Sequence, residues 1–217
     1  MRYKVLLSVM WLTMSIAVGI GVSSSKLYPV RNKYHNMVAA SVLILNEDGS
    51  FGSGVFIKDN VIVTAAHCLI GRDNINIELS DGTILRSSDL YVDNKEDVGF
   101  IFVEADEPSI ARVTVYPGDI GDDVYLVGTP YYTDFKFTIT KGILSHLDRD
   151  GGNWEDLIQT DAEGAPGSSG SPLYDTNGNV IGICVSGPNP GGGITLCESG
   201  KSILEAYERG KEYYCEQ

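Results

Sequence analysis

From residue 37 onward, the chain alternates short runs of apolar and β-branched residues with turns rich in Gly, Asn and Asp. Runs of this kind predict β-strands. Turn sequences such as residues 46–49 (NEDG), 58–60 (KDN) and 80–82 (SDG) lie between neighbouring runs, which is typical of antiparallel hairpins. In the first half, the predicted strands are residues 38–45, 51–57, 61–64, 75–79, 83–85, 90–92 and 98–103.

The second half repeats the pattern, with predicted strands at residues 123–129, 135–144, 156–160, 171–174, 180–185 and 194–196. No long helical pattern lies between the runs, which favours antiparallel β-sheets over alternating strands and helices. Residues 199–214 differ, because apolar residues recur there at helical spacing, with Ser199 or Ser202 as the cap. We therefore expect an all-β fold that ends in a helix packed on the second half.

Composition narrows the class of protein. A chain of 217 residues with 43% hydrophobic residues is large enough for one substantial domain with a packed core. The net charge of -13 argues against a nucleic-acid-binding surface, which would need basic clusters.

Residues 1–25 form a candidate targeting segment. Arg2 and Lys4 give it a positive start, and residues 5–22 are uncharged and largely apolar. This run is longer than the core of most signal peptides and approaches the length that spans a bilayer. We expect export, by a signal peptide or a signal anchor, with cleavage favoured, to a secreted or extracytoplasmic location such as the periplasm or cell surface.

Ser169 is a candidate nucleophile because it lies in residues 167–172 (GSSGSP), where glycines allow tight turns and expose backbone N–H groups. Taken alone, such a string is more often a flexible turn. A serine nucleophile also needs a base and an acid. His67 follows the apolar run 61–63, and Asp97 precedes another at 98–101, which gives the chain order His, Asp, Ser.

Other residues compete for these roles. His35 and His146 are the remaining histidines, and Asp93 and Glu96 lie near Asp97. His67 is preferred because of its flanking residues, and Asp97 because it heads the apolar run.

Three segments carry a family resemblance: residues 65–68 (AAHC), 97–100 (DVGF) and 167–172 (GSSGSP). They resemble the signature segments of trypsin-like serine proteases, which have the chymotrypsin fold of two antiparallel six-stranded β-barrels. Residues 52–57 (GSGVFI), 77–82 (IELSDG) and 160–162 (TDA) extend the resemblance towards the bacterial Deg/HtrA-type branch. It covers about residues 37–206, so we do not expect the peptide-binding PDZ module that many of those proteases carry.

The resemblance implies a protease domain at residues 37–217, with barrel halves at about 37–115 and 116–217. It implies a serine endopeptidase that acts on polypeptides, with His67 as base, Asp97 as its partner and Ser169 as nucleophile. The backbone N–H groups of Gly167 and Ser169 would form the oxyanion hole. No metal or cofactor is implied, and the oligomeric state stays open. A catalytically idle protease fold that serves as a binding module is the alternative.

The same resemblance places a substrate pocket between residues 161–166 and 182–187, with Glu163, Cys184 and Ser186 as substrate-binding residues. Glu163 would favour Lys or Arg if it lined the pocket, but a solvated loop acid is the favoured alternative. Glutamyl endopeptidases have a histidine where this chain has Cys184, which disfavours cleavage after Glu. Small or aliphatic substrate side chains are therefore expected. Ser168 replaces the acid that digestive relatives use for activation, so activation through that salt bridge is not expected.

The four cysteines, Cys68, Cys184, Cys197 and Cys215, allow three complete pairings. Animal trypsin-like enzymes often pair the cysteine after the histidine with one in the preceding strand, and residues 51–54 offer none. Cys68 is therefore expected to be a buried free thiol. Cys184 with Cys197 is the expected disulfide.

Overall fold

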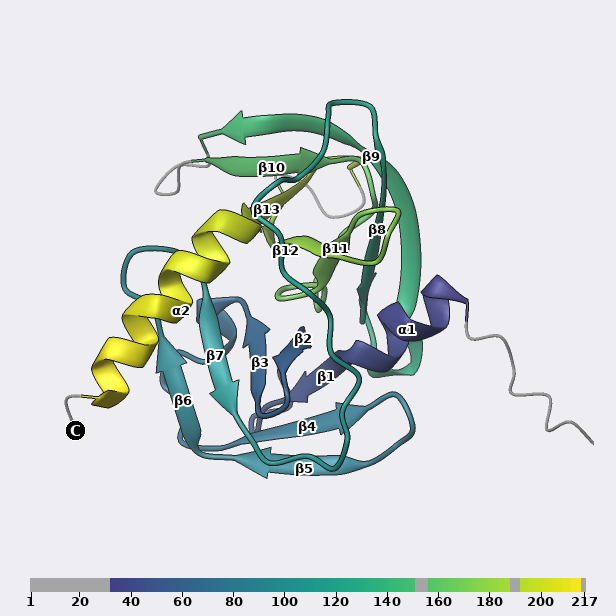
Figure 1. Ribbon diagram of the computed structural model, residues 1–217. Coiled ribbons are helices and arrows are strands. Elements are labelled where there is room, and N and C mark those ends of the chain that lie inside the picture. The colour runs from purple at the N-terminus through teal and green to yellow at the C-terminus, as the bar shows by residue number, and fades with distance from the viewer. Residues whose placement is uncertain (1–31, 151–155, 188–191, 216–217) are drawn as a thin grey trace, which may run out of the picture. The chain divides into compact units, whose positions relative to one another are not determined.

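The computed structural model describes residues 32–150, 156–187 and 192–215, so the candidate targeting segment lies outside the described residues. The described chain forms two β-sheet halves, one after the other, followed by a long helix that lies along both (Figure 1). Neighbouring strands in both sheets run antiparallel.

The first half is a seven-stranded sheet that curls into an almost closed barrel, with strand order β5-β4-β1-β2-β3-β7-β6. Its apolar core contains Ile44, Phe56, Ile62 and Ile101, which come from four different strands. Each of the seven ranges predicted from the sequence corresponds to one strand. The strands are β1 (Ser41–Leu45), β2 (Phe51–Lys58), β3 (Val61–Thr64), β4 (Ile75–Leu79), β5 (Ile84–Ser87), β6 (Asp89–Val92) and β7 (Gly99–Phe102).

The second half is a closed six-stranded barrel in the order β10-β13-β12-β11-β8-β9. Its core includes Leu126, Leu144, Ile158 and Ile181. The strands are β8 (Asp123–Gly128), β9 (Thr138–Arg149), β10 (Leu157–Thr160), β11 (Pro172–Tyr174), β12 (Val180–Ser186) and β13 (Thr195–Ser199). The all-β, chymotrypsin-like fold class is confirmed, although the first half has seven strands where six were expected.

Helix α1 (Lys33–Ala40) differs from the sequence prediction, which had a strand from residue 38. Asn32 caps this helix, since its side chain accepts a hydrogen bond from the His35 backbone N–H. Met37 and Ala40 are the buried residues of the helix. This local capping and burial outweigh the weak strand preference of Val38, so β1 begins only at Ser41.

Helix α2 (Gly200–Cys215) confirms the predicted C-terminal helix. Ser199 is its cap, because the Ser199 Oγ accepts the Ser202 backbone N–H at 3.1 Å. The helix packs on the second barrel and also reaches the first half, where the Tyr207 ring packs edge-on against Phe100. In the part of the chain that the structure describes, no helix is both long enough and apolar enough to cross a membrane.

A third apolar cluster joins the two halves. It combines Val55, Val63 and Phe100 of the first half with Val127 and Ile183 of the second. Two segments that meet along this junction are the turn after β3, which carries His67, and the loop before β11, which carries Ser169.

Candidate active site

His67 and Asp97 form a tightly bonded pair in the first half. His67 lies in the short 3-10 helix η1 (Ala66–Cys68), just after β3, and Asp97 lies just before β7. The His67 Nδ1 is 2.6 Å from the Asp97 Oδ2, and the His67 backbone N–H donates to the Oδ1 at 2.9 Å. The Asp97 side chain is 4% exposed and the His67 side chain 42%. The carboxylate therefore fixes the ring with Nδ1 turned inward and leaves Nε2 available to a reacting group.

The environment of His67 favours its protonated form. The hydrogen bond to Asp97 is the main cause that raises the His67 pKa above its ordinary value of 6.5, and Cys68 adds to it, while burial opposes the change. An imidazolium that forms during a reaction is thus stabilised by the neighbouring carboxylate.

Ser169 follows a tight turn. Within residues 165–168, the Ser168 backbone N–H donates to the Ala165 carbonyl oxygen at 2.8 Å, and Gly167 has a φ of +93°. Pro166 is the second residue of this turn, and Gly167, with its positive φ, is the third. This arrangement is typical of a type II turn. A Cβ at Gly167 would lie 2.2 Å from a ring carbon of Phe51, so only glycine fits.

The nucleophile loop is attached to the first half through β2. The Ser53 backbone N–H donates to the Ser169 carbonyl oxygen at 2.8 Å, and the Ser53 hydroxyl donates to the Gly167 carbonyl oxygen at 3.1 Å. The Cys68 Sγ lies 3.9 Å from the Ser169 carbonyl oxygen, so the Ser169 backbone is next to the residue that follows His67. Among the described residues, no hydrogen bond joins the Ser169 hydroxyl to His67. Such bonds are often long in enzymes without substrate.

The backbone around Gly167 has a defined orientation. The Tyr131 N–H donates to the Pro166 carbonyl oxygen at 2.7 Å. The Pro166–Gly167 peptide is trans, so the Gly167 N–H points away from Tyr131. Within the described ranges, neither the Gly167 N–H nor the Ser169 N–H donates to a protein acceptor. Both groups that the sequence analysis assigned to an oxyanion hole are thus free to bind an oxygen atom.

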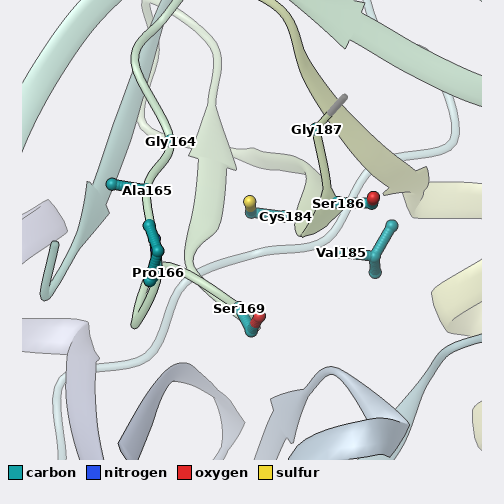
Figure 2. A pocket seen from close by; sticks show the side chains of 8 residues that line it. All are labelled: Gly164, Ala165, Pro166, Ser169, Cys184, Val185, Ser186 and Gly187. Atoms are coloured by element: carbon teal, nitrogen blue, oxygen red, sulfur yellow. The ribbon is translucent and has the colours of Figure 1, made fainter. Parts of the chain in front are cut away.

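A pocket of about 210 Å³ opens beside Ser169. Figure 2 shows the Cys184 sulfur between two walls, with Gly164 to Pro166 on one side and Ser186 and Gly187 on the other. Cys184 and Ser186, two of the three predicted substrate-binding residues, line this pocket. Glu163 does not line it. Its side chain is exposed and accepts a hydrogen bond from the Tyr131 hydroxyl at 3.4 Å.

Three cysteines are free thiols in the part of the chain whose side chains the structure describes. Cys68 is free and buried, as expected. Cys184 and Cys197 lie directly opposite each other on β12 and β13, but both are free, so the expected disulfide is not formed. Within the described ranges, no group of three or more His, Cys, Asp or Glu side chains is arranged to hold a metal ion.

Sequence reasoning assigned no role to three residues that support the site. Ser53 lies in a motif used only for the family resemblance, and Tyr131 supports the loop through its backbone alone. Glu198 left one signal, since it is an acid within the otherwise uncharged strand β13. Its side chain is buried, and its Oε1 accepts the Asp97 backbone N–H at 3.2 Å.

The fold has two curled antiparallel sheets, with a His–Asp pair on one and a glycine-flanked serine on the other. This combination defines a trypsin-like peptidase. The trypsin-like peptidase domain family matches residues 52–183, and the chain belongs to this family. The resemblance to the Deg/HtrA-type branch is also confirmed by individual relatives.

One relative, the probable periplasmic serine endoprotease DegP-like of Halomonas elongata, is 36% identical over 141 residues, which are 63% of this chain and 29% of that protein. Protease Do-like 1, chloroplastic, of Arabidopsis thaliana is 33% identical over 151 residues, which are 65% of this chain and 34% of that protein. The match thus spans about a third of the length of these curated relatives.

Solved structures of HtrA-type proteases are also similar to this chain. The HtrA-type protease AlgW with a tripeptide has a TM-score of 0.72 and 29% identity, over 79% of this chain and 61% of that chain. The serine endoprotease from Yersinia pestis has a TM-score of 0.69 and 27% identity, over 81% of this chain and 65% of that chain.

Proposed function

We infer that this chain is an exported serine endopeptidase that hydrolyses peptide bonds through an acyl-enzyme. The observation that carries the inference is the His67–Asp97 pair, with Nδ1 bonded to a buried carboxylate, beside the turn that carries Ser169. Such a pair converts a weak hydroxyl nucleophile into an effective one.

In the first half-reaction, the Ser169 Oγ attacks the carbonyl carbon of the peptide bond, and the neutral His67 Nε2 takes the hydroxyl proton. His67 then gives this proton to the leaving amine as the C–N bond breaks, which leaves an ester on Ser169. Water hydrolyses the ester in the second half-reaction, again with His67 as base and then acid. Asp97 stays ionised throughout and stabilises the imidazolium.

The developing oxyanion is assigned to the N–H groups of Gly167 and Ser169. Both N–H groups lack a protein acceptor among the described residues. The hydrogen bond from the Tyr131 N–H to the Pro166 carbonyl supports the orientation of the Gly167 N–H. A donor in such a position contributes roughly 3–4 kcal/mol to transition-state stabilisation.

The pocket beside Ser169 is the candidate site for the substrate side chain that precedes the cleaved bond. No charged side chain lines it within the described part of the chain, and Cys184 lies at its centre. A charged side chain would lose its hydration there without gaining a partner. Uncharged, small or aliphatic residues are therefore the proposed preference, and the bound tripeptide of AlgW supports polypeptides as the substrate class.

Export is proposed from two observations. Residues 1–25 have the charge and apolar pattern of a targeting segment. Relatives such as the DegP-like protein of Halomonas elongata are described as periplasmic.

The direct test is digestion of unfolded casein by the purified protein, with peptide products identified by mass spectrometry. Ser169→Ala is the matched control, since it removes a single oxygen atom. Cleavage by the wild type after small or aliphatic residues, absent in Ser169→Ala, is the expected result. A folded wild type that yields no more product than Ser169→Ala would contradict the proposal and favour a binding module.

A further inference from the structure

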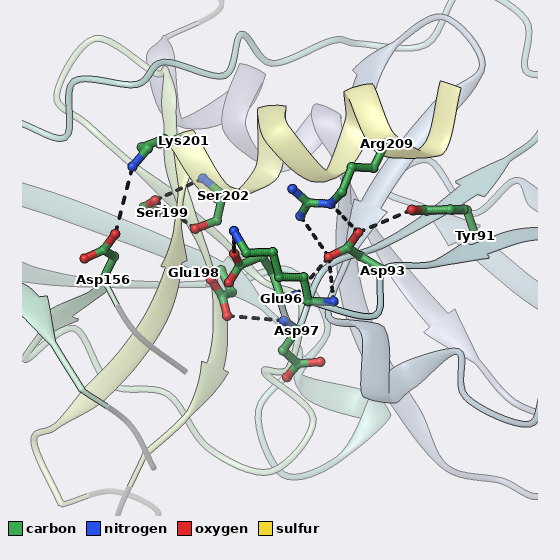
Figure 3. A network of polar contacts seen from close by, with 11 residues as sticks. Tyr91, Asp93, Glu96, Asp97, Asp156, Glu198, Ser199, Lys201, Ser202 and Arg209 are labelled. Atoms are coloured by element: carbon green, nitrogen blue, oxygen red, sulfur yellow. Dashed lines mark hydrogen bonds and ion pairs between the residues drawn. The ribbon is translucent and has the colours of Figure 1, made fainter. Parts of the chain in front are cut away.

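Glu198 is a buried acid that neither gives nor takes a proton in the steps of the proposed mechanism. Its side chain extends from β13 of the second barrel towards the turn that carries Asp97, and the residue is 0% exposed. Its Oε1 accepts the Asp97 backbone N–H at 3.2 Å, while its Oε2 has no hydrogen-bond partner within the described ranges. Figure 3 shows that Glu198 meets the backbone of Asp97, while the Asp97 carboxyl points the other way, as it must to reach His67.

The turn at residues 93–97 is held at both ends by the C-terminal part of the chain. At its first end, Asp93 makes a two-point ion pair with Arg209 of α2, at 2.8 and 2.9 Å. At its last end, Asp97 is bonded to Glu198 (Figure 3). Glu198 therefore connects the His67–Asp97 pair directly to the second barrel.

No cation is left for Glu198 among its described neighbours. Each nearby positive group is already paired with another carboxylate: Arg209 with Asp93, Lys95 with Glu96, His67 with Asp97, and Lys201 with Asp156. Cys197, the neighbour of Glu198 on β13, and Cys184, which lies opposite Cys197 on β12, are free thiols, and α2 contributes the Ser202 hydroxyl.

This environment disfavours the ionised carboxylate. Burial is the largest cause that raises the Glu198 pKa, from 4.5 to about 7, and the charges of Glu96 and Asp97 act in the same direction. The hydrogen bond from the Asp97 N–H and the Ser202 hydroxyl on α2 act against it. A group with such a pKa changes its charge close to neutral pH, directly behind Asp97.

We propose that Glu198 is a positioning residue that holds Asp97 from the second barrel and, through its charge, sets the basicity of His67. The proposal rests on the proposed function, because its effect on rate requires a working triad. When Glu198 is neutral, Asp97 is the only negative group in contact with His67 among the residues that the structure describes. When Glu198 loses its proton to solvent, a second negative charge close to the pair stabilises the imidazolium and lowers the fraction of neutral base.

Two substitutions separate the two parts of the role. Glu198→Gln keeps an acceptor for the Asp97 N–H and removes the charge, whereas Glu198→Leu removes both. We expect Glu198→Leu to lower kcat at least about tenfold with little change in KM, since a displaced Asp97 no longer orients the base. Glu198→Gln should recover most of that loss. Glu205→Gln, an exposed site on α2, is the control for loss of a negative charge.

The charge effect is measured by NMR titration of the His67 ring in wild type, Glu198→Gln and Glu205→Gln. In Glu198→Gln, the His67 pKa should fall by about one pH unit, the size typical of a nearby charge, and Glu205→Gln should match the wild type. An unchanged His67 pKa in Glu198→Gln would overturn the proposal, as would wild-type kcat in folded Glu198→Leu.

This titration does not depend on turnover. A wild-type protein that hydrolyses no peptide would contradict the endopeptidase assignment. A His67 pKa that still responds to Glu198→Gln would support the effect of the Glu198 charge on His67 independently of that assignment. If Glu198→Leu does not fold, the titration of His67 in Glu198→Gln alone decides whether the proposal holds.

Discussion

Ser53→Ala is the substitution that most sharply tests how the nucleophile loop is held. The Ser53 hydroxyl is fully buried and makes two hydrogen bonds, accepting the Thr129 N–H and donating to the Gly167 carbonyl oxygen, both at 3.1 Å. The substitution removes one oxygen atom and keeps the backbone bond from Ser53 to Ser169. The Thr129 N–H and the Gly167 carbonyl then lose their partner.

The expected cost follows from these contacts. A buried hydrogen bond contributes about 0.5–1.5 kcal/mol net, and a buried group left without a partner costs about 1–3 kcal/mol. We expect Ser53→Ala to lower the free energy of unfolding by about 2–3 kcal/mol. Because the Gly167 N–H is a proposed oxyanion-hole donor, a small displacement of its peptide should also lower kcat by about 10- to 100-fold.

Urea denaturation followed by circular dichroism measures the stability, and hydrolysis of a peptide ester or amide measures kcat. Ser41→Ala on β1 is the matched control, since the Ser41 hydroxyl is also buried and bonds to the Met37 carbonyl and the Tyr174 hydroxyl, outside the loop. Ser41→Ala should lose stability but keep kcat. Equal kcat values for the two folded variants would refute the reasoning.

The remaining predictions concern four single positions. Gly170 has a φ of +80°, and a Cβ there would lie 2.1 Å from a backbone oxygen, so Gly170→Ala should cost more than about 3 kcal/mol of unfolding free energy. Gly178→Ala, with a φ of +86° but only one atom within 4 Å, should cost about 1 kcal/mol in the same urea titration. Cys184→Phe fills the pocket and should lower kcat/KM for a leucine peptide, relative to an alanine peptide, by about tenfold or more; an unchanged ratio would exclude this pocket as the specificity site. The raised Glu198 pKa means that the folded state prefers the protonated acid, so stability from this group is complete below pH 4.5 and is lost as pH rises through about 7. This loss amounts to about 3 kcal/mol, and Glu198→Gln should not show it when unfolding is measured across that pH range.

Much of the fold could be predicted from the sequence because its strands are short, apolar and separated by clear turn sequences. All seven strands of the first half and all six of the second correspond to predicted ranges. Helix α1 was missed because its stability comes from the Asn32 cap and from burial of Met37 and Ala40, and the burial is a tertiary effect. The closing of one sheet but not the other depends on strand register, which apolar patterns do not define.

The candidate site was predictable from the sequence only where its residues lie in local motifs. His67, Asp97 and Ser169 lie within recognisable local segments, but each supporting residue acts through a partner far away in the chain. Glu198 bonds to a residue 101 positions earlier. Ser53 bonds to a carbonyl 114 positions later. Local sequence carries no signal for such pairs.

Glu163 shows the limit of assigning roles by motif position. It precedes Gly164, which does line the pocket, yet its own side chain lies outside, beside the Tyr131 hydroxyl. The orientation of one side chain in a loop is set by contacts that the motif does not encode.

The most direct test of the central claim is reaction of the purified protein with a fluorophosphonate, followed by mass spectrometry to locate the adduct. The reagent modifies only a serine whose hydroxyl is activated by a base. The account predicts one adduct, on Ser169, that is absent in Ser169→Ala and nearly absent in His67→Ala. A folded wild-type protein that remains unmodified, or that reacts equally well without His67, would contradict it.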